Sequence, residues 1–260
     1  MRPDAIDLRG FYGTALGQFV AHRLTRSVTN LWGDDLRGMR VGGYGYATPL
    51  LDQLPAAGGD GPERVLSFAP ARQGVVRWPQ RRHQRVALVH GDMMPLPDGA
   101  LDRVILLHAL EGSHDPAALL QEMWRVLSPT GKLIAITPNR LGLWARMEAT
   151  PFGHGRPFSE LQLQKLMRDG LLQPEQWGHA LFMPPMFVNP ARGAKGPLAA
   201  PVWEQLGKRF WPGFGGVIVM EASKQVHALT TTRAPQRVRT RRLIPVMPEP
   251  ARQVPRITKD

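Results

Sequence analysis

A run of apolar residues, LDRVILLHAL from Leu101 to Leu110, constrains the fold of this chain more than any other stretch. A run of this kind is typical of a central strand of a parallel sheet, which helices cover on both faces. Asp115-Pro116 follows it and predicts a helix start, because proline is well suited to the first helical position. Apolar residues at spacings of three and four then mark the buried face of that helix. The stretch therefore predicts a strand–helix unit at the centre of an α/β domain.

Short apolar or β-branched runs alternate with helical patterns on both sides of this unit. The runs that predict further strands are Arg40–Gly43, Arg64–Phe68, Arg85–His90 and Lys132–Thr137. Two more candidates, Ala180–Met183 and Gly216–Ala222, follow later in the chain. Strands alternating with helices of this length indicate parallel β-α-β units. We therefore expect an α/β fold with a doubly wound, mostly parallel seven-stranded sheet.

The segments that flank this pattern define the expected domain organisation. Apolar spacing over Tyr12–Trp32 predicts an amphipathic helix, so residues 1–36 form an N-terminal helical segment. Residues 37–232 form the main domain, with a proline- and glycine-rich insertion at residues 184–214 before the last strand. Residues 233–260 form a basic, proline-rich tail.

The formal net charge of +12 raises the question of an acidic partner. Residues 233–260 hold eight basic and two acidic residues, so half of the excess charge lies in this tail. Five prolines in the same segment predict a solvated, disordered tail, with an electrostatic tether to an acidic partner as the alternative. The positive charge of the chain favours a nucleic-acid partner, but the chain has no motif that reads bases.

Residue types that are missing exclude several classes of protein. The chain has no cysteine, which excludes disulfides, cysteine–zinc sites and thiol nucleophiles. It has no apolar stretch long enough for a membrane span and no signal-peptide pattern at Met1, so we expect a cytoplasmic protein. The histidines show no spacing typical of metal ligands, so we expect no metal.

The stretch RVGGYGYATPLL, from Arg40 to Leu51, can be interpreted in two ways. Glycines between a strand and a helix can bring the backbone close to a cofactor. They can equally serve a tight turn for steric reasons alone. These residues by themselves leave both interpretations open.

The longer stretch from Gly91 to Asn139 decides between them by resemblance. It reads GDMMPLPDGALDRVILLHALEGSHDPAALLQEMWRVLSPTGKLIAITPN. An acidic residue after the third strand, a PLPDGALD approach to the fourth and an RVLSPTGKL turn into the fifth resemble the class I S-adenosylmethionine (SAM) dependent methyltransferases. The likeness is to the small-molecule, type 11 group of that family. The resemblance implies a Rossmann-like methyltransferase fold over residues 37–232, SAM as cofactor and methyl transfer as activity.

The resemblance also implies site residues. Gly43, Gly45 and Ala47 match the first motif of the family, which approaches the methionine part of SAM. Asp92 matches the acid that accepts a hydrogen bond from adenine, and Met93 would pack on the ring. The family usually has acids where this chain has Val41 and Ser67. Ser67 can still bind a ribose hydroxyl, although less strongly than a carboxylate would.

His108 stands at the end of the fourth strand, near the place where the family delivers the methyl group. Histidine titrates near neutrality, so His108 is the candidate general base and a candidate cofactor contact. The alternative is a buried histidine bonded to a backbone carbonyl. Glu111 is a second acid at the same edge, with a solvated position at a helix start as its alternative. The loop TPFGHGRPFS can act as a lid in which His154 and Arg156 face an anionic acceptor, or it is a plain connection.

Three functions remain open. The first is a SAM-dependent methyltransferase acting on a small-molecule acceptor that no motif identifies. The alternative is a catalytically degenerate, methyltransferase-like protein with a binding or regulatory role, which the replaced acids at Val41 and Ser67 favour. The third is a nucleic-acid-associated protein that uses the basic tail.

Overall fold

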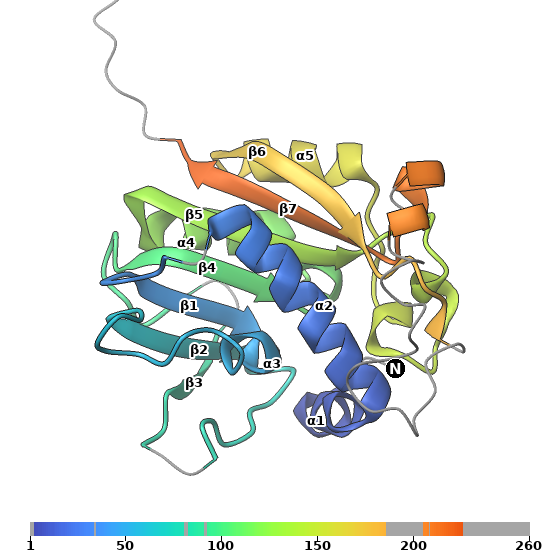
Figure 1. Ribbon diagram of the computed structural model, residues 1–260. Helices are drawn as coiled ribbons and strands as arrows, with labels where there is room; N and C mark the ends of the chain where they lie inside the picture. Colours follow the sequence, from blue (N-terminus) through green and yellow to red (C-terminus); the bar gives the residue numbers. More distant parts are fainter. Residues whose placement is uncertain are drawn as a thin grey trace, which may run out of the picture. The chain divides into compact units, whose positions relative to one another are not determined.

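A single mixed sheet of seven strands organises the protein (Figure 1). The computed structural model describes residues 3–33, 35–80, 83–90, 93–185, 205–207 and 209–225. The strand order is β3-β2-β1-β4-β5-β7-β6. The strands are β1 (Arg40–Gly45), β2 (Arg64–Pro70), β3 (Val86–Val89), β4 (Leu101–Leu107), β5 (Leu127–Pro138), β6 (Leu172–Ala180) and β7 (Val217–Lys224). The predicted seven-stranded, doubly wound sheet is thereby confirmed.

The apolar run that begins at Leu101 forms the centre of this sheet, as predicted. Strand β4 pairs in parallel with β1 on one side and with β5 on the other. Strands β2 and β3 continue the parallel part, while β7 runs antiparallel between β5 and β6. The carboxyl ends of β1, β2, β3 and β4 therefore lie at one edge of the sheet, where ligands bind in open α/β sheets.

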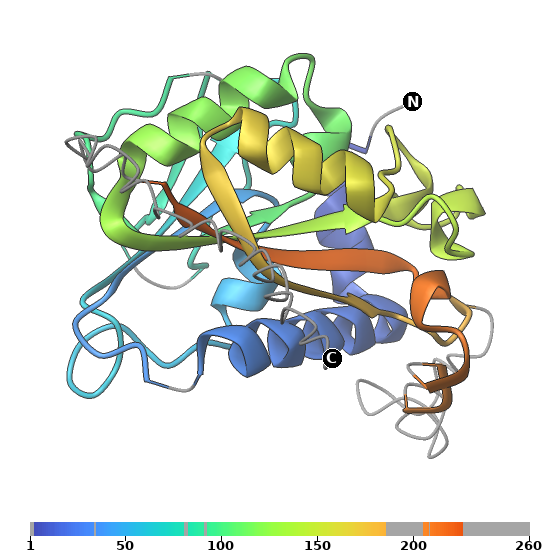
Figure 2. The ribbon, with the colours of Figure 1, turned by 90° about the horizontal axis from the view of Figure 1, so that it is seen from above.

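Helices cover both faces of the sheet (Figure 2). On one face lie α2 (Ala15–Trp32) and the short α3 (Thr48–Leu51), whose apolar residues pack with Ile105 and Ile134. On the other face lie α4 (Pro116–Val126) and α5 (Glu160–Asp169), which pack with Leu106 and Ala135. Alternate residues of the central strands therefore enter two separate cores, as the pleat of a strand requires.

The N-terminal segment differs from the prediction of one helix over Tyr12–Trp32. It forms two helices, α1 (Ala5–Gly13) and α2, because Thr14 ends the first and caps the second. The hydroxyl of Thr14 accepts a hydrogen bond from the amide of Gly17, and its backbone is extended. Tyr12 therefore belongs to α1.

The strand predicted at Ala180–Met183 is wrong, because β6 covers Leu172–Ala180. Apolar and polar residues do not alternate regularly in its sequence QPEQWGH, which includes Pro174. A search for apolar runs therefore does not find this strand. Strand β6 lies at the edge of the sheet, beside β7, where proline and charged residues are common. The other expected strands are found with shifted ends, and β1 reaches Gly45 rather than Gly43.

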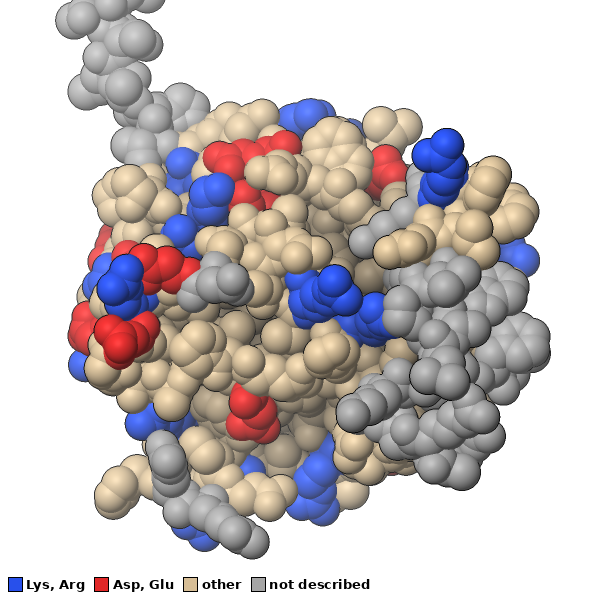
Figure 3. Space-filling view, in the orientation of Figure 1, with Lys and Arg blue, Asp and Glu red and all other residues tan. Residues whose placement is uncertain are grey.

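Charged side chains are interspersed over the face that carries α2 (Figure 3). Among the described residues seen there, lysine and arginine form no continuous patch. Across the described ranges, none of the helices combines the length and the apolar character of a membrane span.

Three predictions fall on residues outside the described ranges. These residues are the tail at residues 233–260, most of the insertion at residues 184–214, and Asp92.

Candidate functional site

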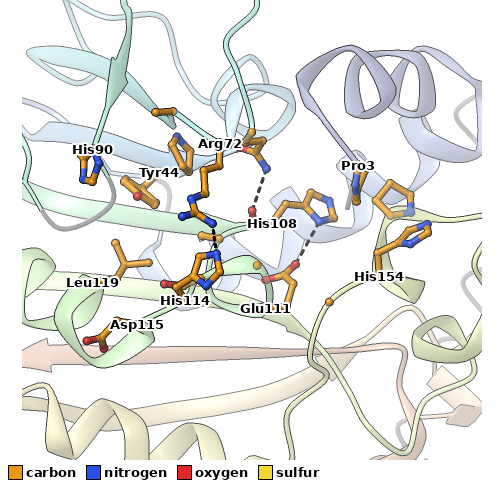
Figure 4. Close-up of a pocket in the computed structure, with 18 residues that line it drawn as sticks. Pro3, Tyr44, Arg72, His90, His108, Glu111, His114, Asp115, Leu119 and His154 are labelled. Atoms are coloured by element: carbon orange, nitrogen blue, oxygen red, sulfur yellow. Dashed lines mark hydrogen bonds and ion pairs between the residues drawn. The ribbon is translucent and has the colours of Figure 1, made fainter. Parts of the chain in front are cut away.

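A cavity of about 260 Å³ lies at the carboxyl edge of the parallel strands (Figure 4). Four strands contribute to its wall: Tyr44 from β1, Pro70 at the end of β2, His90 after β3 and His108 after β4. The loop between β4 and α4 and the loop around His154 line the remaining sides. Pro3, just before α1, completes the wall, so the N-terminal segment covers part of the cavity.

Close contacts within the protein itself require the glycines at positions 43 and 45 of β1. Gly45 has φ +85°, and a Cβ at this position would collide with the carbonyl oxygen of Leu107. A Cβ at Gly43 would lie 2.7 Å from the Cβ of Ala47. The glycines therefore let β1 lie close to β4 and to the turn before α3. Tyr44, between them, is the member of this stretch that lines the cavity.

The other residues predicted to bind cofactor or acceptor are not brought together by the structure. Ser67 is 1% exposed in the interior of β2, and its hydroxyl has no hydrogen-bond partner among the described residues. Met93 is 70% exposed. The side chain of Arg156 is not part of the cavity wall, but its amide donates to the backbone oxygen of Glu111. Of the predicted residues, His108, Glu111 and His154 line the cavity.

His108 takes an unusual backbone conformation at the end of β4, with φ +52°. This left-handed region is uncommon for residues other than glycine, and such residues cluster at functional sites. The backbone oxygen of His108 accepts a hydrogen bond from the Gln73 side chain at 3.0 Å, which helps to hold this conformation. The ring is buried between α1 and the loop that follows β4.

Both ring nitrogens of His108 have partners. Nε2 lies 2.9 Å from the hydroxyl of Tyr12, and Nδ1 lies 3.3 Å from Oε1 of Glu111. Burial, then the charge of Glu111 and the neighbouring Tyr46, raises the pKa of Tyr12 well above its usual value. The phenol therefore keeps its proton, and it shares a hydrogen bond with Nε2 while Nδ1 faces the carboxylate of Glu111. We call these three residues the Tyr12–His108–Glu111 chain.

Glu111 is the buried acid of the cavity wall. It lies in the single-turn helix η1 (Leu110–Gly112) and is 4% exposed, so the alternative of a solvated acid at a helix start is wrong. Neither carboxylate oxygen accepts a hydrogen bond from a described residue. The sequence identified Glu111 as a second acid at this edge, but Tyr12, the partner of His108 almost a hundred residues earlier, gave no signal.

Basic side chains form another part of the wall. Arg72, two residues after β2, contacts Nε2 of His114 through its guanidinium group. His154 contacts the backbone oxygen of Glu148 at 2.9 Å. Sequence reasoning did not select Arg72, although its place after a parallel strand is a signal for this edge. In the described part of the chain, no three histidine or acidic side chains are placed to hold a metal ion.

The strand order, the antiparallel seventh strand and a cavity over β1, β2 and β4 together define the Rossmann-like methyltransferase fold. A family profile described as a methyltransferase domain matches residues 42–135, which run from β1 into β5. A probable SAM-dependent methyltransferase of Mycolicibacterium smegmatis is 31% identical over 129 residues, 48% of this chain and 47% of the relative. The chain thus spans about half the length of the curated relatives that it matches over this region.

Solved structures agree with the fold. A SAM-dependent methyltransferase of Thermotoga maritima, described as a possible histamine N-methyltransferase, superimposes with a TM-score of 0.55 at 19% identity. The superposition covers 81% of this chain and 91% of that protein. A SAM-dependent methyltransferase of Archaeoglobus fulgidus gives a TM-score of 0.53 at 13% identity, covering 83% and 96% of the two chains. Residues 42–135 thus match a methyltransferase domain, and the fold is similar to that of SAM-dependent methyltransferases.

Proposed function

We propose that the protein transfers a methyl group from SAM to a small-molecule acceptor bound at the carboxyl edge of the sheet. The observation that carries the proposal is the cavity of about 260 Å³, whose wall includes the ends of all four strands β1 to β4. Three of these strands, β1, β2 and β4, lie side by side at the place where ligands bind in this type of sheet.

The residues present fit SAM in part. The turn at Gly43, Gly45 and Ala47 is proposed to lie against the methionine part of SAM, and Asp92 and Met93 to hold the adenine. Ser67 has an unpartnered buried hydroxyl, which fits a hydrogen-bonding role but lies outside the cavity wall. Glu111, a buried acid whose carboxylate faces Nδ1 of His108, belongs to the same wall. SAM supplies an activated methyl group, and the chain supplies orientation and the exclusion of water.

His108 is proposed as the base of the site. Its Nδ1 faces Glu111, whose carboxylate would stabilise the ring after proton uptake at Nε2. Because the hydroxyl of Tyr12 occupies Nε2, a proton reaches this nitrogen either through that hydroxyl or after its displacement. His154 and Arg156 remain the proposed contacts of an anionic acceptor.

Calorimetric titration of the full chain with SAM and with S-adenosylhomocysteine tests the proposal. Saturable binding of both is expected, together with methyl transfer to acceptors found in a small-molecule screen. In that assay His108→Asn should lower the turnover while leaving the SAM affinity nearly unchanged. Saturable binding without transfer to any acceptor would support the alternative, a degenerate binding or regulatory protein. Absence of binding at millimolar ligand would contradict both.

A further inference from the structure

An apolar surface lies beside the start of β7, outside the cavity wall. It consists of exposed leucine and aromatic side chains from two segments, the loop after β5 and the segment before β7. These residues are Leu141, Leu143, Leu206, Phe210, Trp211 and Phe214, and their exposed fractions range from 43% to 60%. Single exposed apolar residues are normal, whereas a cluster of them marks a binding surface. We call these six residues the apolar patch.

Close backbone contacts join the two segments of the apolar patch (Figure 1). Leu141 and Leu143 flank Gly142. A Cβ at Gly142 would lie 2.5 Å from the carbonyl oxygen of Gly215, which directly follows Phe214. The loop after β5 therefore touches the segment before β7.

The other members of the apolar patch lie close together along the second segment. The rings of Phe210 and Trp211 have their centroids 6.0 Å apart. The amide of Trp211 donates to the backbone oxygen of Gly207, which follows Leu206. The amide of Phe214 donates to the backbone oxygen of Trp211. The six side chains therefore belong to one region of the surface.

A buried asparagine fixes the backbone of this region. Asn139 is 2% exposed, and its side-chain nitrogen donates to the backbone oxygens of Gly213 and Gly215 at 2.8 Å each. Its side-chain oxygen accepts from the amide of Leu141 at 3.2 Å. The apolar patch is thus fixed in shape before a partner binds, which reduces the entropy lost on binding.

Basic residues outnumber acidic ones around the apolar patch. Among the described residues of 139–160 and 205–216, the charged ones are Arg140, Arg146, Arg156 and Arg209 against Glu148 and Glu160. All four arginines are exposed, and Glu160 lies 3.2 Å from His179. The whole chain carries a formal net charge of +12. An acidic surface is therefore the complementary partner.

We infer that the apolar patch docks the protein on the surface of an anionic phospholipid bilayer. The aromatic and leucine side chains enter the boundary between headgroups and acyl chains, where tryptophan is enriched, and the arginines contact the lipid phosphates. Docking of this kind requires no membrane-spanning helix. The inference does not depend on the proposed function, because it does not involve the cavity.

Two other partners fit this surface less well. In a two-fold dimer the apolar patch would face its own copy, which brings arginines of like charge together. A nucleic acid would contact the arginines and stack on Phe210 and Trp211, but leucine side chains offer no face on which bases stack.

Flotation of the full chain with vesicles tests the inference. We expect binding to vesicles of phosphatidylcholine and phosphatidylglycerol in equal amounts, and binding about tenfold weaker or less to pure phosphatidylcholine. The double variant Phe210→Ser/Trp211→Ser should bind the mixed vesicles about tenfold more weakly, because it buries less apolar area. The control is Val75→Ser/Leu88→Ser, which removes two exposed apolar side chains outside the apolar patch and should stay within about twofold of the wild type.

The basic tail at residues 233–260 also attracts anionic vesicles. Measurement at about 1 M sodium chloride separates the two contributions, because the screening length is then about 3 Å. Binding that remains at this salt concentration should be present in the wild type and lost in Phe210→Ser/Trp211→Ser. Equal vesicle binding by the two proteins at both salt concentrations would assign the binding to the tail and overturn the inference.

Trp211→Phe tests insertion directly, because it keeps an aromatic side chain and removes one fluorophore. Vesicles with brominated acyl chains should quench the tryptophan fluorescence of the wild type more than that of this variant, while the affinities stay within about twofold. Equal quenching of the two proteins would show that Trp211 stays outside the bilayer and would contradict the inference.

A charge variant keeps the test open if the double serine variant fails to fold. Arg140→Gln/Arg209→Gln should bind the mixed vesicles severalfold more weakly and pure phosphatidylcholine unchanged. A wild-type protein that binds neither type of vesicle would overturn the inference. So would a wild-type dimer, seen by sedimentation velocity, that dissociates in Phe210→Ser/Trp211→Ser, because it would assign the apolar patch to a second copy of the chain.

Discussion

Gly45 meets two requirements that other residue types do not meet. Its φ of +85° is costly for residues with a side chain, and a Cβ would collide with the carbonyl oxygen of Leu107. We expect Gly45→Ala to lower the free energy of unfolding by about 2–4 kcal/mol, measured by urea denaturation.

Gly10→Ala in α1 is the matched control for this change. A Cβ there meets nothing within 4 Å, and alanine favours a helix. This variant should be as stable as the wild type or slightly more stable. Equal changes in the free energy of unfolding at Gly10 and Gly45 would contradict the steric explanation of the glycines in β1.

Lys132 neutralises a buried acid on the face of the sheet. Its Nζ lies 2.7 Å from Glu221, which is fully buried in β7, and 2.9 Å from Glu175 in β6. Lys132→Met would leave Glu221 buried without this cation, so we expect a loss of about 2–4 kcal/mol in the free energy of unfolding. Lys165→Met on the exposed side of α5 should change it by less than about 0.5 kcal/mol. Similar losses in the two variants, measured by denaturation, would contradict this account.

At the scale of elements, an ion pair ties the start of β1 to the start of β4. Two nitrogens of the Arg40 side chain and its backbone amide donate to Asp102 at 2.9–3.0 Å. Partial burial raises the pKa of this carboxyl, but the hydrogen bonds from Arg40 outweigh it and lower the pKa of Asp102 to about 2.

A lowered pKa in the folded state has a defined pH dependence. The stability that Asp102 contributes should be complete above its unfolded pKa of about 4 and should be lost as the pH falls toward about 2. Asp102→Asn should therefore cost about 1–2 kcal/mol at pH 7 and lose less on acidification than the wild type. Denaturation curves at pH 7, 4 and 3 measure this difference. A constant difference between the two proteins across these values would contradict the assigned role.

The elements also show what local sequence patterns predict and what they miss. The run at Leu101 identified β4 because burial on both faces leaves a continuous apolar signal. The start of α5 carries a local signal too, because Ser159 and Gln162 form a capping box. Strand β6 was misplaced, since an edge strand with Pro174 lacks that signal.

The candidate site was predictable only where it depends on topology. His108 could be placed at the edge of β4 from strand order alone. Its contact with Tyr12 depends on how α1 folds over that edge, a tertiary arrangement that no local pattern encodes. The same holds for the burial of Glu111, because the loop at Gly155 and Arg156 packs against its backbone.

At the scale of the whole molecule, the sheet predicts the order of hydrogen exchange. Strands β1, β4 and β5 are each paired on both sides, whereas β3 and β6 lie at the two ends of the strand order. We expect the slowest amide exchange in the three central strands and faster exchange in β3, a strand of four residues with partly exposed side chains. Exchange measured by mass spectrometry tests this order. Protection of β3 equal to that of β4 would indicate that something further covers this edge.

The insertion of β7 between β5 and β6 has a consequence for synthesis on the ribosome. Neither β5 nor β6 pairs with the other, so both present open hydrogen-bonding edges until residues 217–224 emerge. At roughly 5–20 residues per second, the nascent chain spends seconds in this state after β6 has left the exit tunnel. Exposed strand edges invite pairing with other chains. Chaperone capture is therefore expected to be strongest on ribosome-bound chains that contain β6 but lack β7.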